Sequence, residues 1–192
     1  MDSSVINSAI QYIKTLFQNK SDGHDAQHTL RVYHNALLIS ESEPDCNLFV
    51  VSLAALLHDV DDYKLFRTEN NANARTFLSS QHIEPEQIDY ICYIINSVSF
   101  SKNHGKRLAS IDAKIVQDAD RLDAIGAIGI ARTFAYGGKC GRTLEYSVQH
   151  FHKKLLLLKG EMNTKRAKEI AELRHDFMEH FLREWDKESA QR

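Results

Sequence analysis

Residues Val50–Tyr63, VVSLAALLHDVDDY, indicate how this chain folds and what its centre contains. A run of apolar and small residues ends there in a group of polar side chains: His58, Asp59, Asp61 and Asp62. Aspartate is almost never fully buried unless an ion, water or a hydrogen-bond network accompanies it. Adjacent residues on a helix point about 100° apart, but His58 and Asp59 can both bind one ion that lies at the helix end. This stretch alone supports a cation site and a solvated helix exit equally.

The composition is that of one globular domain. The chain has 192 residues, of which 43% are hydrophobic and 26% are charged, so a sizeable core can form. We expect a single domain over residues 1–192, with a core at about 20–135 and C-terminal helices at 144–187 packed on it. A formal net charge of -2 argues against a nucleic-acid polymer as the partner, because no excess of Lys and Arg exists to bind phosphates.

Neither the cysteines nor the apolar segments indicate export or membrane insertion. Cys46, Cys92 and Cys140 are isolated, which indicates reduced thiols rather than a disulfide framework or a zinc site. The N-terminus lacks a basic segment before an apolar core, and the longest apolar stretch, Leu48–Leu57, is too short to span a bilayer. We therefore expect a cytoplasmic protein with no membrane segment.

Apolar residues recur at spacings of three and four along the chain, which predicts an all-α fold. The central helix is expected to end at His58 and to have Asp45 as its N-cap, because Pro44 ends the helix before it. No strand-like alternation extends beyond a few residues.

The second half of the chain continues the helical pattern. One helix is expected over Lys114–Phe134, where Gly126 and Gly129 indicate a close contact with a second helix. A Gly-rich basic turn is expected at Tyr136–Thr143, and two more helices after it. The last helix carries an apolar stripe that we expect to face the core: Ile170, Leu173, Phe177, Phe181 and Trp185.

Two further groups of polar residues interrupt the apolar pattern. His24 and His28 are four residues apart, so they share one face of a helix, as metal-binding histidine pairs do. Asp118, Asp120 and Asp123 crowd an otherwise apolar segment. Capping of the helix dipole favours carboxylates in a first turn by roughly 0.3–1 kcal/mol, which explains one or two of these acids but not their spacing. Each group alone is a weak signal for a metal site.

In chain order, the three groups supply a His, a His-Asp doublet and a distant Asp. This order resembles the signature of the HD-domain metal-dependent phosphohydrolases. The similar segments are longer than the signature itself: DAQHTLRV at 25–32, LLHDVDDYK at 56–64, SFS at 99–101 and IVQDADRLDAIGAIGIAR at 115–132. They are similar to the small bacterial YedJ/YpgQ-like branch of this family. The resemblance implies an all-α, single HD-domain helical bundle with a metal in a central cleft.

The resemblance also implies which residues hold the metal. They are His28, His58, Asp59 and Asp120, with Asp118 as the alternative to Asp120. Imidazole and carboxylate ligands without a thiolate suit one divalent ion, Mn²⁺ first, with Ni²⁺, Co²⁺, Fe²⁺ and Mg²⁺ as alternatives. Asp62, one turn beyond His58, is the candidate general base, and a solvent-facing helix end explains it equally well.

The activity implied by the resemblance is hydrolysis of a small phosphorylated substrate, expected to be a nucleotide. Members of this branch act as nucleotide pyrophosphohydrolases, which cleave nucleoside triphosphates to a monophosphate and pyrophosphate. Lys64 and Arg132 are the preferred phosphate-binding residues, because they lie inside the similar segments. Two basic loops, Lys102–Arg107 and Lys139–Arg142, are the second choice.

Three alternative functions stay open. The chain could be a phosphomonoesterase or phosphodiesterase that acts on another small phosphate ester. A non-catalytic nucleotide-binding module would keep the fold without turnover, although all four ligand positions are occupied here. A di-iron oxygenase would need further histidine ligands, which only scattered positions supply. The native metal, the physiological substrate and the choice between monomer and homodimer are also left open.

Overall fold

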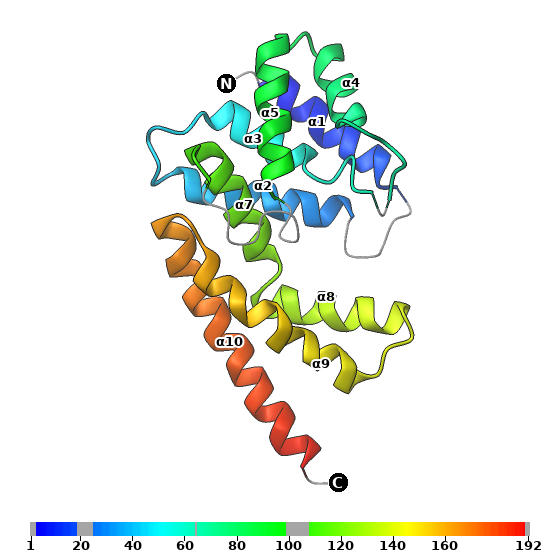
Figure 1. Ribbon diagram of the computed structural model, residues 1–192, viewed down its shortest axis with the longest axis vertical. Coiled ribbons are helices and arrows are strands. Elements are labelled where there is room, and N and C mark those ends of the chain that lie inside the picture. Colours follow the sequence, from blue (N-terminus) through cyan, green and yellow to red (C-terminus); the bar gives the residue numbers. More distant parts are fainter. Residues whose placement is uncertain (1–2, 19–24, 64, 99–107, 191–192) are drawn as a thin grey trace. The chain divides into compact units, whose positions relative to one another are not determined.

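The computed structural model describes residues 3–18, 25–63, 65–98 and 108–190. Within these ranges every regular element is a helix, which confirms the predicted all-α fold (Figure 1). No helix in the same ranges is long and apolar enough to cross a membrane. The chain divides into two compact units between Asp120 and Arg121. The expected single domain over residues 1–192 stays a prediction.

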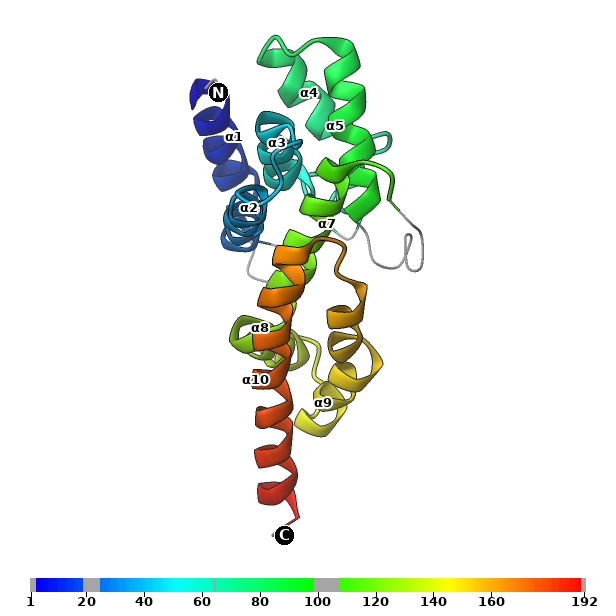
Figure 2. The same cartoon turned by 90° about the vertical axis from the view of Figure 1, so that its left-hand side faces the viewer.

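The first unit is built around α3 (Leu48–Leu57), whose residues from Val50 onward are all buried. Three helices pack against it (Figure 2): α1 (Ser3–Leu16), α2 (Ala26–Ser40) and α5 (Pro85–Val98). α4 (Ala72–Ser80) packs on α5, and α7 (Ile111–Asp123) belongs to this unit as far as Asp120. Because α3 is covered on several sides, it is apolar all round rather than amphipathic.

The N-cap of α3 is Asn47, so the prediction of Asp45 is wrong. The Asn47 side chain accepts a hydrogen bond from the backbone N–H of Val50 at 3.2 Å, which is the usual N-cap bond. The backbone N–H of Asn47 itself donates to the Asp112 carboxylate at 2.8 Å. The start of α3 is therefore tied to the first turn of α7, a contact that local sequence does not reveal.

The second unit contains four helical segments: α8 (Gly126–Lys139), α9 (Leu144–Lys153), the 3-10 helix η1 (Leu155–Glu161) and α10 (Lys165–Ser189). α8 packs on both α9 and α10, and η1 also contacts α9 and α10 (Figure 2). Aromatic rings join three of these segments. Phe134 of α8 contacts Phe151 of α9 as well as Phe181 and Trp185 of α10, at centroid distances from 5.8 to 6.0 Å.

The helix predicted over Lys114–Phe134 is two helices, because α7 ends at Asp123 and α8 begins at Gly126. Gly126 has a φ of +78°, a left-handed conformation that side chains with a Cβ rarely adopt. A Cβ at this position would also lie 3.0 Å from Cγ of Arg174. The expected close contact with a second helix therefore exists at Gly126, at a break rather than within one helix. At Gly129 the prediction is wrong, because an added Cβ would meet the backbone of Ala124 instead.

The predicted turn at Tyr136–Thr143 is shorter than expected, because α8 continues to Lys139. Gly137 lies inside this helix, where a Cβ would collide with Oγ of Ser147. Glycine is therefore needed at this position for the close approach of α8 and α9. Of the glycines that suggested a turn, Gly137 serves helix packing, whereas Gly141, with a φ of +66°, lies in the turn itself.

The prediction that an apolar stripe on α10 faces the core is wrong for two residues. Leu173 and Phe177 are 74% and 52% exposed. The buried face consists of other residues: Ala167, Ala171, His175, Met178 and Leu182. α10 packs on α8 and η1, and Leu173 and Phe177 lie outside its buried face.

Candidate metal centre

His58 directly follows the last residue of α3, and one hydrogen bond sets how its ring is presented. Its Nδ1 lies 2.8 Å from the carbonyl oxygen of Ala55. Because a carbonyl can only accept a hydrogen bond, Nδ1 carries a proton and donates it. In the neutral ring the lone pair is therefore on Nε2, which is the nitrogen that would bind a metal.

His28 approaches His58 from the first turn of α2. Asp25 caps this helix, since its carboxylate accepts a hydrogen bond from the backbone N–H of His28 at 2.7 Å. The imidazole of His28 is buried, and its Nε2 lies 3.3 Å from Nε2 of His58. Two nitrogens from distant parts of the chain thus point to the same position.

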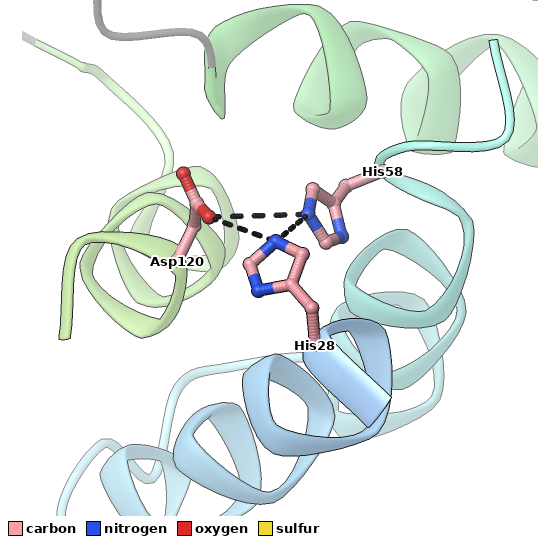
Figure 3. A group of neighbouring side chains, drawn as sticks. All are labelled: His28, His58 and Asp120. Carbon is pink, nitrogen blue, oxygen red and sulfur yellow. Dashed lines mark hydrogen bonds and ion pairs between the residues drawn. The ribbon is translucent and has the colours of Figure 1, made fainter. Parts of the chain in front are cut away.

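Two carboxylates complete this group, and Figure 3 shows one of them, Asp120, facing His28 and His58. Asp59 Oδ2 lies 3.4 Å from Nε2 of each histidine. Asp120 Oδ1 lies 3.5 Å from Nε2 of His28 and 3.9 Å from Nε2 of His58. The ligand atoms of His28, His58 and Asp120 all lie within 4.8 Å of one another. All four residues belong to the first unit.

The donor set and the charge of this centre fit a divalent cation. Atoms that bind one ion at about 2.1 Å lie roughly 3 Å apart when they are adjacent in its coordination sphere, close to the separations found here. Burial lowers the pKa of His58, but the charges of Asp59 and Asp120 outweigh it and raise the pKa to about 9. A positive charge is therefore favoured between these groups, whether a proton or a metal ion supplies it.

Asp120, rather than Asp118, is the acid that the structure brings to the histidines. Both lie on α7, but residues two apart on a helix point about 200° away from each other. Asp118 is fully buried and does not join the group of His28, His58 and Asp120.

The two later aspartates of the HDVDD segment differ in their contacts. The Asp61 carboxylate accepts hydrogen bonds from the backbone N–H groups of Asn73 and Ala74, both at 3.0 Å. It therefore caps α4, whose own N-cap residue makes no such bond. The backbone of Asp62 is held in a turn, with its N–H donating to the Asp59 carbonyl at 3.1 Å. The general-base role of Asp62 stays a prediction.

The predicted phosphate-binding residues have different positions. Arg132 forms an ion pair with Asp123 at 2.5 Å, within the second unit. Lys139 and Arg142 also belong to the second unit. Lys64, the basic loop at 102–107 and His24 lie outside the described residues.

Two buried amide side chains in the first unit were not predicted from the sequence. Asn35 Nδ2 donates to the Ala119 carbonyl at 3.1 Å and so joins α2 to α7 beside Asp120. Gln117 Nε2 donates to the Ser97 carbonyl at 2.8 Å and joins α7 to α5. For Asn35 there was a signal: it lies seven residues after His28, on a helix face that is otherwise apolar.

Residues 25–125 match the family described as "HD domain", and this range includes all four residues of the centre. The uncharacterized protein YpgQ of Bacillus subtilis is 41% identical to this chain over 186 residues, which is 92% of this chain and 90% of YpgQ.

Solved structures are similar over almost the whole chain. The structure of Bacillus subtilis YpgQ in complex with ADP matches with a TM-score of 0.84 and 37% identity, over 97% of this chain and 95% of that one. An HD-superfamily hydrolase from Bacillus thuringiensis matches with a TM-score of 0.82 and 39% identity, over 100% of both chains. The helical arrangement described above is thus shared with these proteins.

Proposed function

This chain belongs to the HD-domain family, in its YpgQ-like branch, and from that premise we propose that it is a metal-dependent phosphohydrolase. We propose further that it cleaves nucleoside triphosphates to a monophosphate and pyrophosphate. The observation that carries this proposal is the convergence of two imidazole Nε2 atoms and two carboxylates at 3.3 to 3.9 Å. The ADP in the YpgQ structure supports a nucleotide as the class of ligand.

His28, His58, Asp59 and Asp120 would hold the divalent ion, with Mn²⁺ as the first candidate. When bound, such an ion would polarise a phosphoryl oxygen and lower the pKa of a water molecule. The protein's own contribution is orientation and charge. The Ala55 carbonyl holds His58 with Nε2 toward the centre, and the two carboxylates balance the charge of the cation.

The bond expected to break joins the α phosphorus to the oxygen that bridges to the β phosphorus. A water oxygen bonds to the α phosphorus, pyrophosphate leaves with the bridging oxygen, and Asp62 accepts the proton of the water. Lys64 and Arg132 are candidates for binding the remaining phosphates. Because Arg132 already pairs with Asp123, a phosphate would share its guanidinium with that carboxylate.

The test begins with elemental analysis of the purified protein, followed by incubation with Mn²⁺ and dATP in ¹⁸O-labelled water. We expect dAMP and pyrophosphate in equal amounts, with the label in dAMP because the water attacks the α phosphorus. Initial formation of dADP and orthophosphate would refute this cleavage. Turnover only of another phosphate ester would favour a phosphomonoesterase or phosphodiesterase, and no turnover of any ester would favour a non-catalytic nucleotide-binding module.

The role of Asp62 is tested by Asp62→Asn. If this carboxylate is the general base, turnover of dATP should fall by roughly 10²–10⁴ while Mn²⁺ stays bound. Asp61→Asn is the matched control, because Asp61 caps α4 and its loss should lower thermal stability rather than turnover. If turnover of dATP falls only a few-fold in Asp62→Asn, Asp62 is not the general base, and the interpretation as a solvent-facing helix end holds.

A further inference from the structure

Asp112, in the first turn of α7, is a buried acid that takes no part in the metal centre. Its Oδ1 accepts a hydrogen bond from the backbone N–H of Asn47 at 2.8 Å, and its Oδ2 accepts one from the hydroxyl of Tyr90 at 2.9 Å. Asn47 is the N-cap of α3, and Tyr90 lies on α5. One buried carboxylate therefore joins three helices of the first unit.

Two hydroxyl groups hold this carboxylate at the start of α7. The Tyr90 hydroxyl gives its one proton to Asp112, so Ser110 is the donor in the bond of 2.6 Å between the two hydroxyls. Ser110 directly precedes α7, and its Oγ accepts a hydrogen bond from the backbone N–H of Ala113 at 3.4 Å, as an N-cap residue does. The first turn of α7 is thus bonded in place by a continuous chain of polar groups.

The Asp112 carboxylate also lies at two helix N-termini at once. The backbone N–H groups of a first turn carry partial positive charge, which stabilises an anion beside them. Asp112 belongs to the first turn of α7, and the N–H that it accepts from Asn47 is at the start of α3. An acid can therefore be buried here, and its position fixes the two helix starts against each other.

The same two helices carry candidate metal ligands at their other ends. His58 follows α3, eleven residues after Asn47, and Asp120 lies on α7, eight residues after Asp112. At 1.5 Å per residue these spans are about 16 Å and 12 Å. The two helices start together at Asp112, and the side chains of His58 and Asp120 meet again in the metal centre (Figure 3). α3 and α7 therefore run in the same direction.

We propose that Asp112 is a positioning residue of the metal centre: by holding the starts of α3 and α7 together, it sets how closely His58 and Asp120 approach. A binding site needs its groups within about 0.5 Å of their working positions. Because a helix is a rigid element, a tilt at the first turn of α7 displaces a side chain two turns later. The inference rests on the proposed function only in taking His58 and Asp120 as metal ligands.

The test compares variants of the full-length protein by equilibrium dialysis with Mn²⁺. Asp112→Ala removes both hydrogen bonds and should weaken Mn²⁺ binding by roughly tenfold, at the lower end of the range for residues that orient metal ligands. Asp112→Asn should bring the affinity back to within a few-fold of wild type. Its amide oxygen can accept from the N–H of Asn47, and its amide nitrogen can donate to the Tyr90 hydroxyl.

Two changes at Asn47 separate the link to α7 from the cap of α3. Asn47→Ala loses the side-chain cap but keeps the backbone N–H that Asp112 accepts, so stability should fall while Mn²⁺ affinity stays within a few-fold of wild type. Asn47→Pro also removes that N–H, at a φ of -85° that is close to the range of proline. It should weaken Mn²⁺ binding as Asp112→Ala does, and it serves as the second test if Asp112→Ala does not fold.

A second readout needs no metal. In ¹H–¹⁵N spectra of the metal-free protein, the amide signals of His58 and Asp120 should shift in Asp112→Ala and stay in place in Asn47→Ala. Only the first variant breaks the link between α3 and α7. If the wild-type protein does not bind Mn²⁺, the proposed metal centre is refuted, and these spectra still decide whether Asp112 positions the two residues.

Three results would overturn the proposal. Wild-type Mn²⁺ affinity in Asp112→Ala and Asn47→Pro, or unchanged signals of His58 and Asp120, would show that the contact does not reach the centre. An equal loss of affinity in Asn47→Ala would indicate general destabilisation. A loss in Asp112→Asn as large as in Asp112→Ala would show that the charge of the acid, rather than its hydrogen bonds, affects the ion.

Discussion

Asp120 and Asp123 lie three residues apart on α7, yet their charges are balanced in different ways. The Asp123 side chain is 3% exposed and pairs with Arg132 of its own unit. The Asp120 side chain is 30% exposed and faces His28 and His58; among the described residues it pairs with no Lys or Arg. The Asp123 pair is complete without a ligand, whereas the Asp120 group needs a proton or a metal ion.

This difference separates a structural ion pair from a candidate binding site. An aspartate on α7 stabilises the fold when the chain itself supplies the opposite charge, as Arg132 does for Asp123. Where the chain supplies only imidazoles, the carboxylate raises the pKa of its neighbour instead, as it does for His58. The contrast can be tested by removing each group in turn.

The largest effect is expected from His58→Ala. Loss of this Nε2 should abolish bound Mn²⁺ and turnover of dATP while leaving a helical fold, because the remaining groups would form an incomplete ligand set. Metal content, activity and circular dichroism of the purified variant give the three readouts. His175→Gln is the control, since it changes a buried histidine of the second unit that pairs with Glu179. Full activity of His58→Ala with unchanged metal content would show that the centre has been misassigned.

A smaller effect is expected from Asn35→Leu, which removes the hydrogen bond to the Ala119 carbonyl. Asp120 should then be held less precisely against the histidines, and Mn²⁺ affinity should fall by roughly 10–100-fold, as for other residues that orient metal ligands. Equilibrium dialysis measures this affinity. Gln117→Met removes a similar buried bond to Ser97 and should affect metal binding less. Equal losses in both variants would indicate general destabilisation instead of a specific role for Asn35.

The smallest effect on metal binding is expected from Asp123→Asn. This change removes the partner of Arg132 and should lower the free energy of unfolding by about 1–3 kcal/mol, because a charged hydrogen bond is lost. Mn²⁺ affinity should stay as in wild type. Asp120→Asn should do the reverse, with loss of Mn²⁺ binding and little change in stability of the metal-free protein. Denaturant unfolding and dialysis of both variants would show whether the two carboxylates are as different as proposed.

Local periodicity predicted the helical fold and the central helix, because spacings of three and four follow directly from helix geometry. It failed where a long-range contact decides the structure. The predicted helix is broken before Gly126, which has a φ of +78° and lies against Arg174, and Asn47 caps α3 while its backbone N–H donates to Asp112. Leu173 and Phe177 complete a regular apolar stripe, yet the residues that α10 buries are others.

The sequence by itself predicted a helical chain that resembles the HD-domain family, and it singled out His28, His58, Asp59 and Asp120, with Asp118 as the alternative to Asp120, as candidates for one metal. Only the tertiary structure decided that Asp120 rather than Asp118 faces the histidines, and that the Ala55 carbonyl orients His58. The physical reason is that an ion site depends on distances between side chains from three helices. Those distances are set by packing and buried hydrogen bonds, such as the one from Asn35 to Ala119, which no local pattern encodes.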